Sequence, residues 1–332
     1  MPDPARTAPQ PEHKDRRGGL VLGGVVLILV GAGCAVLVPS GFLGAALDQP
    51  GQSWRNSLGI ASICLALAAS LVWLGIGSIL VRRWARTLIL MLAWTWLITG
   101  IVHTALMAFL LPAMTKWMLL GGEYGSDIEH LYPIVIGVVL VMMGTLLVAL
   151  PGALILFYGS KHVRATVEAR DPRLSWTERR PQPVVLLSVT HAVLAYLLVV
   201  IGLMYRFTVP WFGMLATDWS GAGVVLASTA VSVYLAVALY ERRPSAWWIA
   251  TGLAAAWTLS AVMTFLRVPV GAYYVAAGMP PETLQLLAAM GDLTWVTVSS
   301  IVAISGAYFV YLVYARRFYR GRPVSAGAPT IE

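Results

Sequence analysis

Long apolar stretches alternate with short polar stretches along almost the whole chain. Each apolar stretch has about 20 residues or more, the length that an α-helix needs to cross the hydrocarbon core of a bilayer. The pattern therefore predicts an all-α fold, a polytopic integral membrane helix bundle with about eight transmembrane helices. The predicted helices cover residues 19–39, 57–81, 87–111, 131–157, 184–205, 221–240, 245–266 and 294–315.

One polar run interrupts the apolar pattern in its middle. This run, FYGSKHVRATVEARDPRLSWTERRPQP, covers residues 157–183 and is the longest polar stretch inside the chain.

The first apolar segment is longer than the apolar region of a signal peptide, about 7–15 residues, so we expect it to stay uncleaved. The predicted parts are a disordered cytoplasmic tail (1–18), a first four-helix half (19–158), a cytoplasmic connecting loop (159–183), a second four-helix half (184–315) and a cytoplasmic tail (316–332).

Composition and charge agree with a membrane protein. Hydrophobic residues make up 58% of the chain, charged residues 11%, and the mean hydropathy is +0.77, whereas soluble domains carry about a quarter charged residues. If both termini are cytoplasmic, 19 of the 23 Lys and Arg residues lie on the cytoplasmic side, as the positive-inside rule requires. This topology, in a bacterial cytoplasmic (inner) membrane, accounts for the net charge of +8 without a nucleic-acid partner.

The two halves resemble each other, with the same succession of helices, loops and a short basic turn. Because each half has an even number of helices, the halves would be parallel repeats. The motifs that recur in order are Val38-Pro39 with Val209-Pro210, Arg82-Arg83 with Arg242-Arg243, Ala93-Trp94-Thr95 with Ala256-Trp257-Thr258, and Leu111-Pro112 with Val268-Pro269, the last pair at the ends of the third helices.

Several residues inside the predicted helices carry structural expectations. Pro151 removes a backbone donor and should kink the fourth helix, and Pro281 should begin a short surface helix. Cys34 and Cys64 lie in apolar segments, and we expect thiols rather than a disulfide. Glycines that would let backbones approach closely are Gly19, Gly23, Gly137, Gly144, Gly202 and Gly306.

Ionisable groups are scarce inside the predicted helices, where they would mark an ion path. No Asp, Glu, Lys or Arg falls in the middle of a segment, and the intramembrane polar candidates are His103 and His191. These histidines lie ~25 Å and ~10 Å from the cytoplasmic ends of their helices at 1.5 Å per residue, so they cannot share one haem iron. We therefore expect no cofactor and interpret both as hydrogen-bonding residues.

The loop before the fourth helix holds the candidate metal ligands. Carboxylates and imidazoles bind divalent cations, but a solvated acidic loop explains the same residues. The sequence contains no P-loop, GxGxxG, GxSxG or HExxH motif, so no catalytic residue is predicted. The candidate ligands are Glu123, Asp127, Glu129 and His130.

The connecting loop is the richest polar segment and the candidate docking surface for a protein partner or for lipid headgroups. Its cations alone are explained by its cytoplasmic position. The sequence FYGSKHVRATVEARDP resembles a loop in bacterial multi-pass membrane proteins to which no activity is assigned. The resemblance covers about 30 residues. The candidate docking residues are Lys161, His162, Arg164, Arg170, Arg173, Trp176, Arg179 and Arg180.

Three functions fit these observations. The first is a non-catalytic scaffold, docking protein or complex subunit, indicated by the lack of intramembrane ionisable groups and by the length of the connecting loop. The second is a transporter or channel for a neutral or lipidic solute, suggested by the repeat and the kinked fourth helix. The third is a membrane redox or metal-binding protein.

Overall fold

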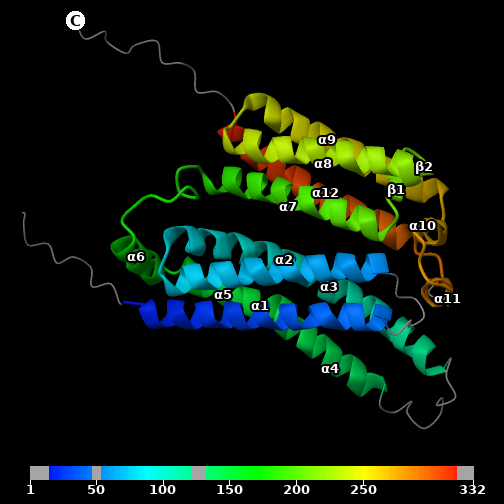
Figure 1. The fold of residues 1–332 in the computed structure, drawn as a ribbon, viewed down its shortest axis with the longest axis horizontal. Helices are drawn as coiled ribbons and strands as arrows, with labels where there is room; N and C mark the ends of the chain where they lie inside the picture. The colour runs from blue at the N-terminus through cyan, green and yellow to red at the C-terminus, as the bar shows by residue number, and fades with distance from the viewer. Residues whose placement is uncertain (1–14, 47–53, 121–131, 290, 320–332) are drawn as a thin grey trace, which may run out of the picture. The chain divides into compact units, whose positions relative to one another are not determined.

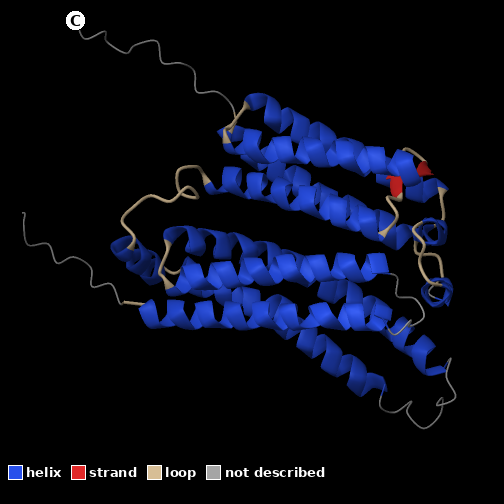
Figure 2. Ribbon diagram, viewed as in Figure 1, coloured by secondary structure: helices blue, strands red, loops and turns tan. Residues whose placement is uncertain are grey.

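The computed structural model describes residues 15–46, 54–120, 132–289 and 291–319, and these residues are almost entirely helical (Figures 1 and 2). The first elements are α1 (Arg17–Ala46), α2 (Trp54–Ile79), α3 (Arg83–Leu120), α4 (Tyr132–Gly144), a π-helix (Thr145–Ala149), α5 (Leu150–Gly159) and α6 (Lys161–Arg170). The remaining elements are α7 (Gln182–Met204), β1 (Val209–Trp211), β2 (Met214–Ala216), α8 (Asp218–Tyr240), α9 (Pro244–Arg267), α10 (Val270–Ala276), α11 (Pro281–Ala289), α12 (Thr294–Ala315) and a 3-10 turn (Arg316–Phe318).

The predicted all-α bundle is confirmed. Within the described residues, eight helices are long and apolar enough to cross a membrane, and each overlaps one of the eight predicted segments. This length and composition indicate a lipid bilayer as the surroundings of the protein. The short helix predicted at Pro281 is present as α11, and Cys34 and Cys64 are thiols.

The chain forms two compact units. Unit 1 comprises Met1–Val36 and Leu65–Arg179, and unit 2 comprises Leu37–Cys64 and Arg180–Glu332. The junction near residue 180 falls in the predicted connecting loop. The sequence assigned residues 37–64 to the first half, but they belong to the second unit, so α1 and α2 each contribute to both.

In unit 1, α1 and α2 touch backbone to backbone at one pair of glycines. A Cβ atom added to Gly24 would lie 2.6 Å from the carbonyl oxygen of Gly75, and one added to Gly75 would lie 2.6 Å from that of Gly24. Such an approach is open only to glycine. Of the glycines predicted for this role, Gly19 and Gly23 face the rings of Phe157 and Tyr158.

The other predicted glycines have mixed outcomes. Gly202 packs against Phe207 and Val225 in unit 2. The prediction is wrong for Gly137, Gly144 and Gly306, because a Cβ added to any of these three would meet nothing within 4 Å among the described residues.

The fourth span of unit 1 absorbs Pro151 by a local change of helix type. Residues Thr145–Ala149, just before the proline, form a π-helix in which the amide of Leu150 donates to the carbonyl of Thr145. A proline at 151 cannot donate to the carbonyl of Leu147, and Gly100 of α3 lies directly against that carbonyl. The predicted distortion is therefore a π-bulge, which is a common cause of helix bending.

In unit 2, α7 packs along α8, and α9 packs against α12 and α8 (Figure 1). Pro183 and Pro244 stand in the first turns of α7 and α9, where the missing amide hydrogen would have had no partner. Asp218 occupies the first turn of α8, where a negative charge is favoured by the helix dipole.

A small β-hairpin joins α7 to α8, which the sequence did not predict. Its strands pair antiparallel with Val209 opposite Ala216 and Trp211 opposite Met214. The two turn residues, Phe212 and Gly213, have φ of 43° and 96°, the signs of a type I′ turn.

Side chains of α9 hold this hairpin in place. Ser260 Oγ accepts from the amide of Phe212 at 2.9 Å and donates to the carbonyl of Pro210 at 2.9 Å. Thr264 Oγ1 accepts from the amide of Gly213 at 3.0 Å. Because Ser260 and Thr264 are one helical turn apart, they present both hydroxyls on one face of α9.

The buried cores of the two units repeat each other at a fixed spacing of 161 residues, as between Tyr158 and Tyr319. The hydroxyl of Tyr158 bonds Ser78 Oγ at 2.6 Å, and the hydroxyl of Tyr319 donates to the carbonyl of Leu239 at 3.2 Å; Ser78 and Leu239 have the same spacing. Further buried pairs at this spacing are Leu74 with Leu235, Ala85 with Ala246, Ile89 with Ala250 and Leu154 with Ala315.

The turns after the second helix of each copy also match. The amide of Arg82 donates to the carbonyl of Gly77, and the amide of Arg243 donates to that of Ala238. Each turn places one residue with positive φ before that arginine, which is the Schellman arrangement. The duplication predicted from the sequence is supported, but Arg82 corresponds to Arg243, one position away from the predicted alignment.

Two of the motifs used for the predicted repeat do not correspond in structure. Val38-Pro39 lies inside α1, whereas Val209-Pro210 lies in β1. Leu111-Pro112 lies inside α3, which continues to Leu120, whereas α9 ends at Arg267. Apolar composition with scattered prolines produced these two matches, and the buried tyrosines give the better alignment.

Candidate functional site

The predicted docking loop is folded, and its first part is a helix that belongs to the core of unit 1. Ser160 has extended backbone and its Oγ accepts from the amide of Val163 at 3.3 Å, which caps the start of α6. Val163 and Val167 are fully buried in the core of unit 1. Thr166 Oγ1 accepts from the amide of Arg16 at 3.1 Å, so α6 also fixes the start of α1.

Arg83, the first residue of α3, holds the rest of the segment in place. Its guanidinium donates to the carbonyl of Asp171, to the carbonyl of Glu168 and to the carboxylate of Glu178 at 3.3 Å. Its backbone amide donates to Asp171 Oδ2 at 3.2 Å. A planar guanidinium with five donors suits such a multiple contact. From the sequence alone, Arg83 is only one of the cations that indicate topology, and nothing there predicts these contacts.

The charged residues of this segment face outward on that rigid support. We define the basic platform as Ser160–Arg179, with the exposed side chains of Lys161, His162, Arg164, Arg170, Arg173 and Arg179. Arg164 pairs with Glu168, and this hydrogen bond holds the pKa of that carboxyl below its ordinary value. Arg170 pairs with Asp15 at 3.1 Å. Both pairs are solvent-exposed, so they restrain the cations only weakly.

Two apolar side chains are exposed among these cations. Leu174 is 64% exposed and Trp176 is 40% exposed. The hydroxyls of Ser175 and Thr177 bond each other at 2.8 Å, and the amide of Glu178 donates to the carbonyl of Ser175. This local turn holds Trp176 at the surface while Thr177 is buried. Arg180, predicted for the same surface, belongs to unit 2, where its guanidinium lies 5.7 Å from the ring centre of Tyr240.

The intramembrane histidines differ in their environments. His191 is 2% exposed, with Nδ1 3.0 Å from the carbonyl of Leu187 and Nε2 3.4 Å from the hydroxyl of Tyr308 on α12. This agrees with the hydrogen-bonding role predicted for it. His103 is exposed on α3, where it would face lipid or another helix.

The predicted metal ligands Glu123, Asp127, Glu129 and His130 lie outside the described residues. Within the part of the chain that the structure describes, no group of three or more His, Cys, Asp or Glu residues could hold a metal ion.

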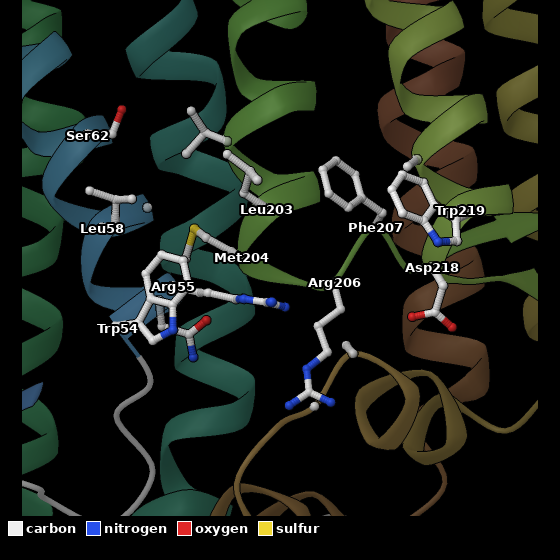
Figure 3. A pocket seen from close by; sticks show the side chains of 16 residues that line it. Trp54, Arg55, Leu58, Ser62, Leu203, Met204, Arg206, Phe207, Asp218 and Trp219 are labelled. Atoms are coloured by element: carbon white, nitrogen blue, oxygen red, sulfur yellow. The ribbon is translucent and has the colours of Figure 1, made fainter.

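Unit 2 contains a groove that sequence reasoning did not find. Its volume is about 980 Å³, and it lies where α2 and α8 begin and α7 ends (Figure 3). The apolar side chains of Leu58, Leu203 and Met204 line it, and Arg55, Arg206 and Asp218 supply the charged groups. The sequence showed these arginines only as cations at the outer ends of helices.

No protein-family model, curated protein or solved structure matches the chain. The resemblance of residues 157–172 to a loop of bacterial multi-pass membrane proteins therefore stays a prediction.

Proposed function

We propose that the protein is a non-catalytic docking protein of the bacterial cytoplasmic membrane, with both termini in the cytoplasm, and that the basic platform binds a cytoplasmic protein with an acidic surface. The positive-inside rule supports the orientation, because 19 of the 23 Lys and Arg residues lie on the cytoplasmic side when both termini are cytoplasmic.

The folding of the platform carries this proposal. A connection between two helices of this protein needs only a few residues, as the turns Leu80–Arg82 and Glu241–Arg243 show. Orientation in the membrane requires positive charge but no particular fold. The platform instead has a capped helix, a buried core contact and the Arg83 contacts, which together fix the positions of its exposed side chains.

The exposed composition of the platform favours a protein partner. Trp and Arg are the residues most enriched among those that dominate binding energy at protein interfaces. Here Trp176 is exposed on a structured turn, with Arg173 and Arg179 three residues before and after it. Fixed cations around an apolar centre complement an acidic surface that has an apolar patch.

The test uses full-length protein in cells and then in mild detergent. A photo-crosslinking amino acid at position 173 should capture a cytoplasmic protein, which is then identified and purified. We expect Arg179→Glu with Trp176→Ala to weaken the binding of that protein at least tenfold. Arg243→Glu, a matched reversal at an exposed turn arginine of unit 2, should leave the binding unchanged.

Equal binding by the platform variant and by wild type would refute the proposal. So would a variant that keeps its protein partner and instead loses affinity for anionic lipid nanodiscs, because the platform would then serve headgroups. Wild-type elution volume and melting temperature of each variant show that a lost interaction does not come from unfolding.

A further inference from the structure

We propose that the groove of unit 2 is a binding site for one anionic glycerophospholipid, with the phosphate at Arg55 and Arg206 and the first part of an acyl chain along the apolar wall. This function is independent of the docking proposed for the platform. The ligand belongs to the leaflet that faces the hairpin side of unit 2.

The groove has an apolar wall and a cationic rim. Leu58 comes from α2, and Leu203 and Met204 come from the last turn of α7; all three side chains line the cavity. In Figure 3 the side chains of Arg55 and Arg206 come from different segments, and both lie below Leu58 and Leu203 in the view. Apolar surface next to a cationic rim matches the acyl chain and phosphate of a lipid.

The charge of the groove is not balanced within it. Arg55 and Arg206 bring two positive charges, and Asp218 brings one negative charge. Within the described residues, neither guanidinium forms an ion pair at 4.0 Å or less; Arg55 lies over the ring of Trp54, with 5.5 Å to its centre. The remaining positive charge complements the single negative charge of an anionic phospholipid.

The backbone at Arg206 adopts an energetically unfavourable conformation that positions its side chain. Arg206 and Phe207 both have positive φ, 53° and 54°, a region that non-glycine residues seldom occupy and that often marks functional sites. The guanidinium packs over Gly278, where a Cβ would lie 2.5 Å from Nε and where φ is +76°. A cation held by its backbone and by a glycine beneath it is placed in advance for an anion.

The level of the groove along the helices fits a headgroup. The groove lies where α2 and α8 begin, and both helices have the length and composition of membrane spans. Trp54 and Trp219, which also line it, are 66% and 92% exposed. Tryptophans at helix ends mark the interface at which phosphates lie, so a lipid could enter sideways without leaving its leaflet.

The test measures the lipid that full-length protein retains after purification from nanodiscs that contain equal amounts of phosphatidylglycerol and phosphatidylcholine. Native mass spectrometry should show one retained phosphatidylglycerol on wild type. We expect Arg55→Ala with Arg206→Ala to reduce this retention at least tenfold. Arg267→Ala is the matched control, since its guanidinium packs over Gly213 of the hairpin and does not line the groove.

A second variant tests the apolar part of the site without changing its charge. Ala222 also lines the groove, and Ala222→Trp should fill it and reduce retention at least tenfold with both arginines in place. Glycerol 3-phosphate, the headgroup chemistry without chains, should displace no lipid at millimolar concentration. Displacement would assign the site to a soluble phosphate compound and overturn the lipid proposal.

Three further results would overturn the proposal: equal retention by the double arginine variant, equal retention of phosphatidylcholine by wild type, or an equal loss in Arg267→Ala. If the double variant does not fold, Ala222→Trp decides, and unchanged retention in that variant refutes the site. Because these variants lie outside the platform, failure here leaves the docking proposal standing, and the reverse also holds.

Discussion

The crossing of α1 and α2 gives the sharpest prediction on stability, because the helices meet at Gly24 and Gly75 with no room for a methyl group on either residue. A methyl group added to Gly24 would lie 2.6 Å from the carbonyl oxygen of Gly75 and 2.7 Å from Ile79 Cγ1. Added to Gly75, it would lie 2.6 Å from the carbonyl oxygen of Gly24 and 2.7 Å from Ile28 Cγ1. A side-chain carbon can rotate away, but a backbone carbonyl cannot, so Gly24→Ala or Gly75→Ala must push the two helices apart.

The expected magnitude follows from two opposing effects. Overpacking of this kind costs about 1–3 kcal/mol, while alanine favours a helix over glycine by about 0.8–1 kcal/mol. Gly33→Ala in α1 should gain helix propensity without overpacking, because no described atom lies within 4 Å of a Cβ at that position. Relative to Gly33→Ala, each crossing variant should be destabilised by about 1–3 kcal/mol.

The measurement is a thermal melt of purified protein in one detergent, followed by tryptophan fluorescence at one scan rate, since melting of membrane proteins is often irreversible. At about 2–4 °C per kcal/mol, the crossing variants should melt roughly 2–12 °C below Gly33→Ala. In the double variant Gly24→Ala with Gly75→Ala, the loss should be smaller than the sum of the single losses, because the first methyl group already separates the helices. Equal melting temperatures for Gly24→Ala and Gly33→Ala would refute the close crossing.

Three further predictions concern single side chains. Tyr158→Phe and Tyr319→Phe should each lower the free energy of unfolding by about 0.5–1.5 kcal/mol, the net worth of one hydrogen bond, as read from melting temperatures. Ser260→Ala should speed hydrogen exchange at the amide of Phe212, which loses its acceptor. Burial raises the pKa of Tyr273 to about 12, so the unfolded chain loses this proton first; stability should fall from pH 10 to 12 by up to about 1.4 kcal/mol per pH unit, and less so in Tyr273→Phe.

Each of these predictions has a control and a contradicting outcome. Tyr314→Phe changes an exposed tyrosine and should leave the melting temperature unchanged; an equal shift would deny a role to the buried hydroxyls. Thr258→Ala removes a hydroxyl that donates to the carbonyl of Ala254 in its own helix, so exchange at Phe212 should not change. Identical alkaline stability profiles of wild type and Tyr273→Phe would show that Tyr273 does not titrate at a raised pKa.

Hydropathy was sufficient for the eight spans, because a bilayer imposes a length and a composition on every helix that crosses it. It was insufficient at the hairpin. Strands of three residues have no measurable period, and Phe212-Gly213 lacks the Asn-Gly or Asp-Gly signature of a type I′ turn. What holds the hairpin is Ser260 and Thr264 on α9, about 50 residues away, which no local pattern reports.

The candidate site was predictable only in part. The composition of residues 159–183 pointed to the segment, but nothing local indicates that Arg83 would bind it, because Arg83 also satisfies the positive-inside rule. The groove was missed for a similar reason: Arg55 and Arg206 are far apart in the sequence, and each alone is an ordinary interfacial cation. One signal was available, since Phe-Tyr recurs at 157–158 and 318–319 and gives the spacing at which the two cores correspond.

The spacing of 161 residues identifies the buried residues that the two copies have in common. Leu74, Ala85 and Tyr158 have buried counterparts in the second copy, so these positions belong to a core that both copies build. Helix α6 begins three residues after Tyr158 and adds Val163 and Val167 to the core of unit 1. Besides these two core residues, α6 carries the exposed side chains of Lys161, His162 and Arg164, which is why the platform, rather than the shared core, is the proposed docking surface.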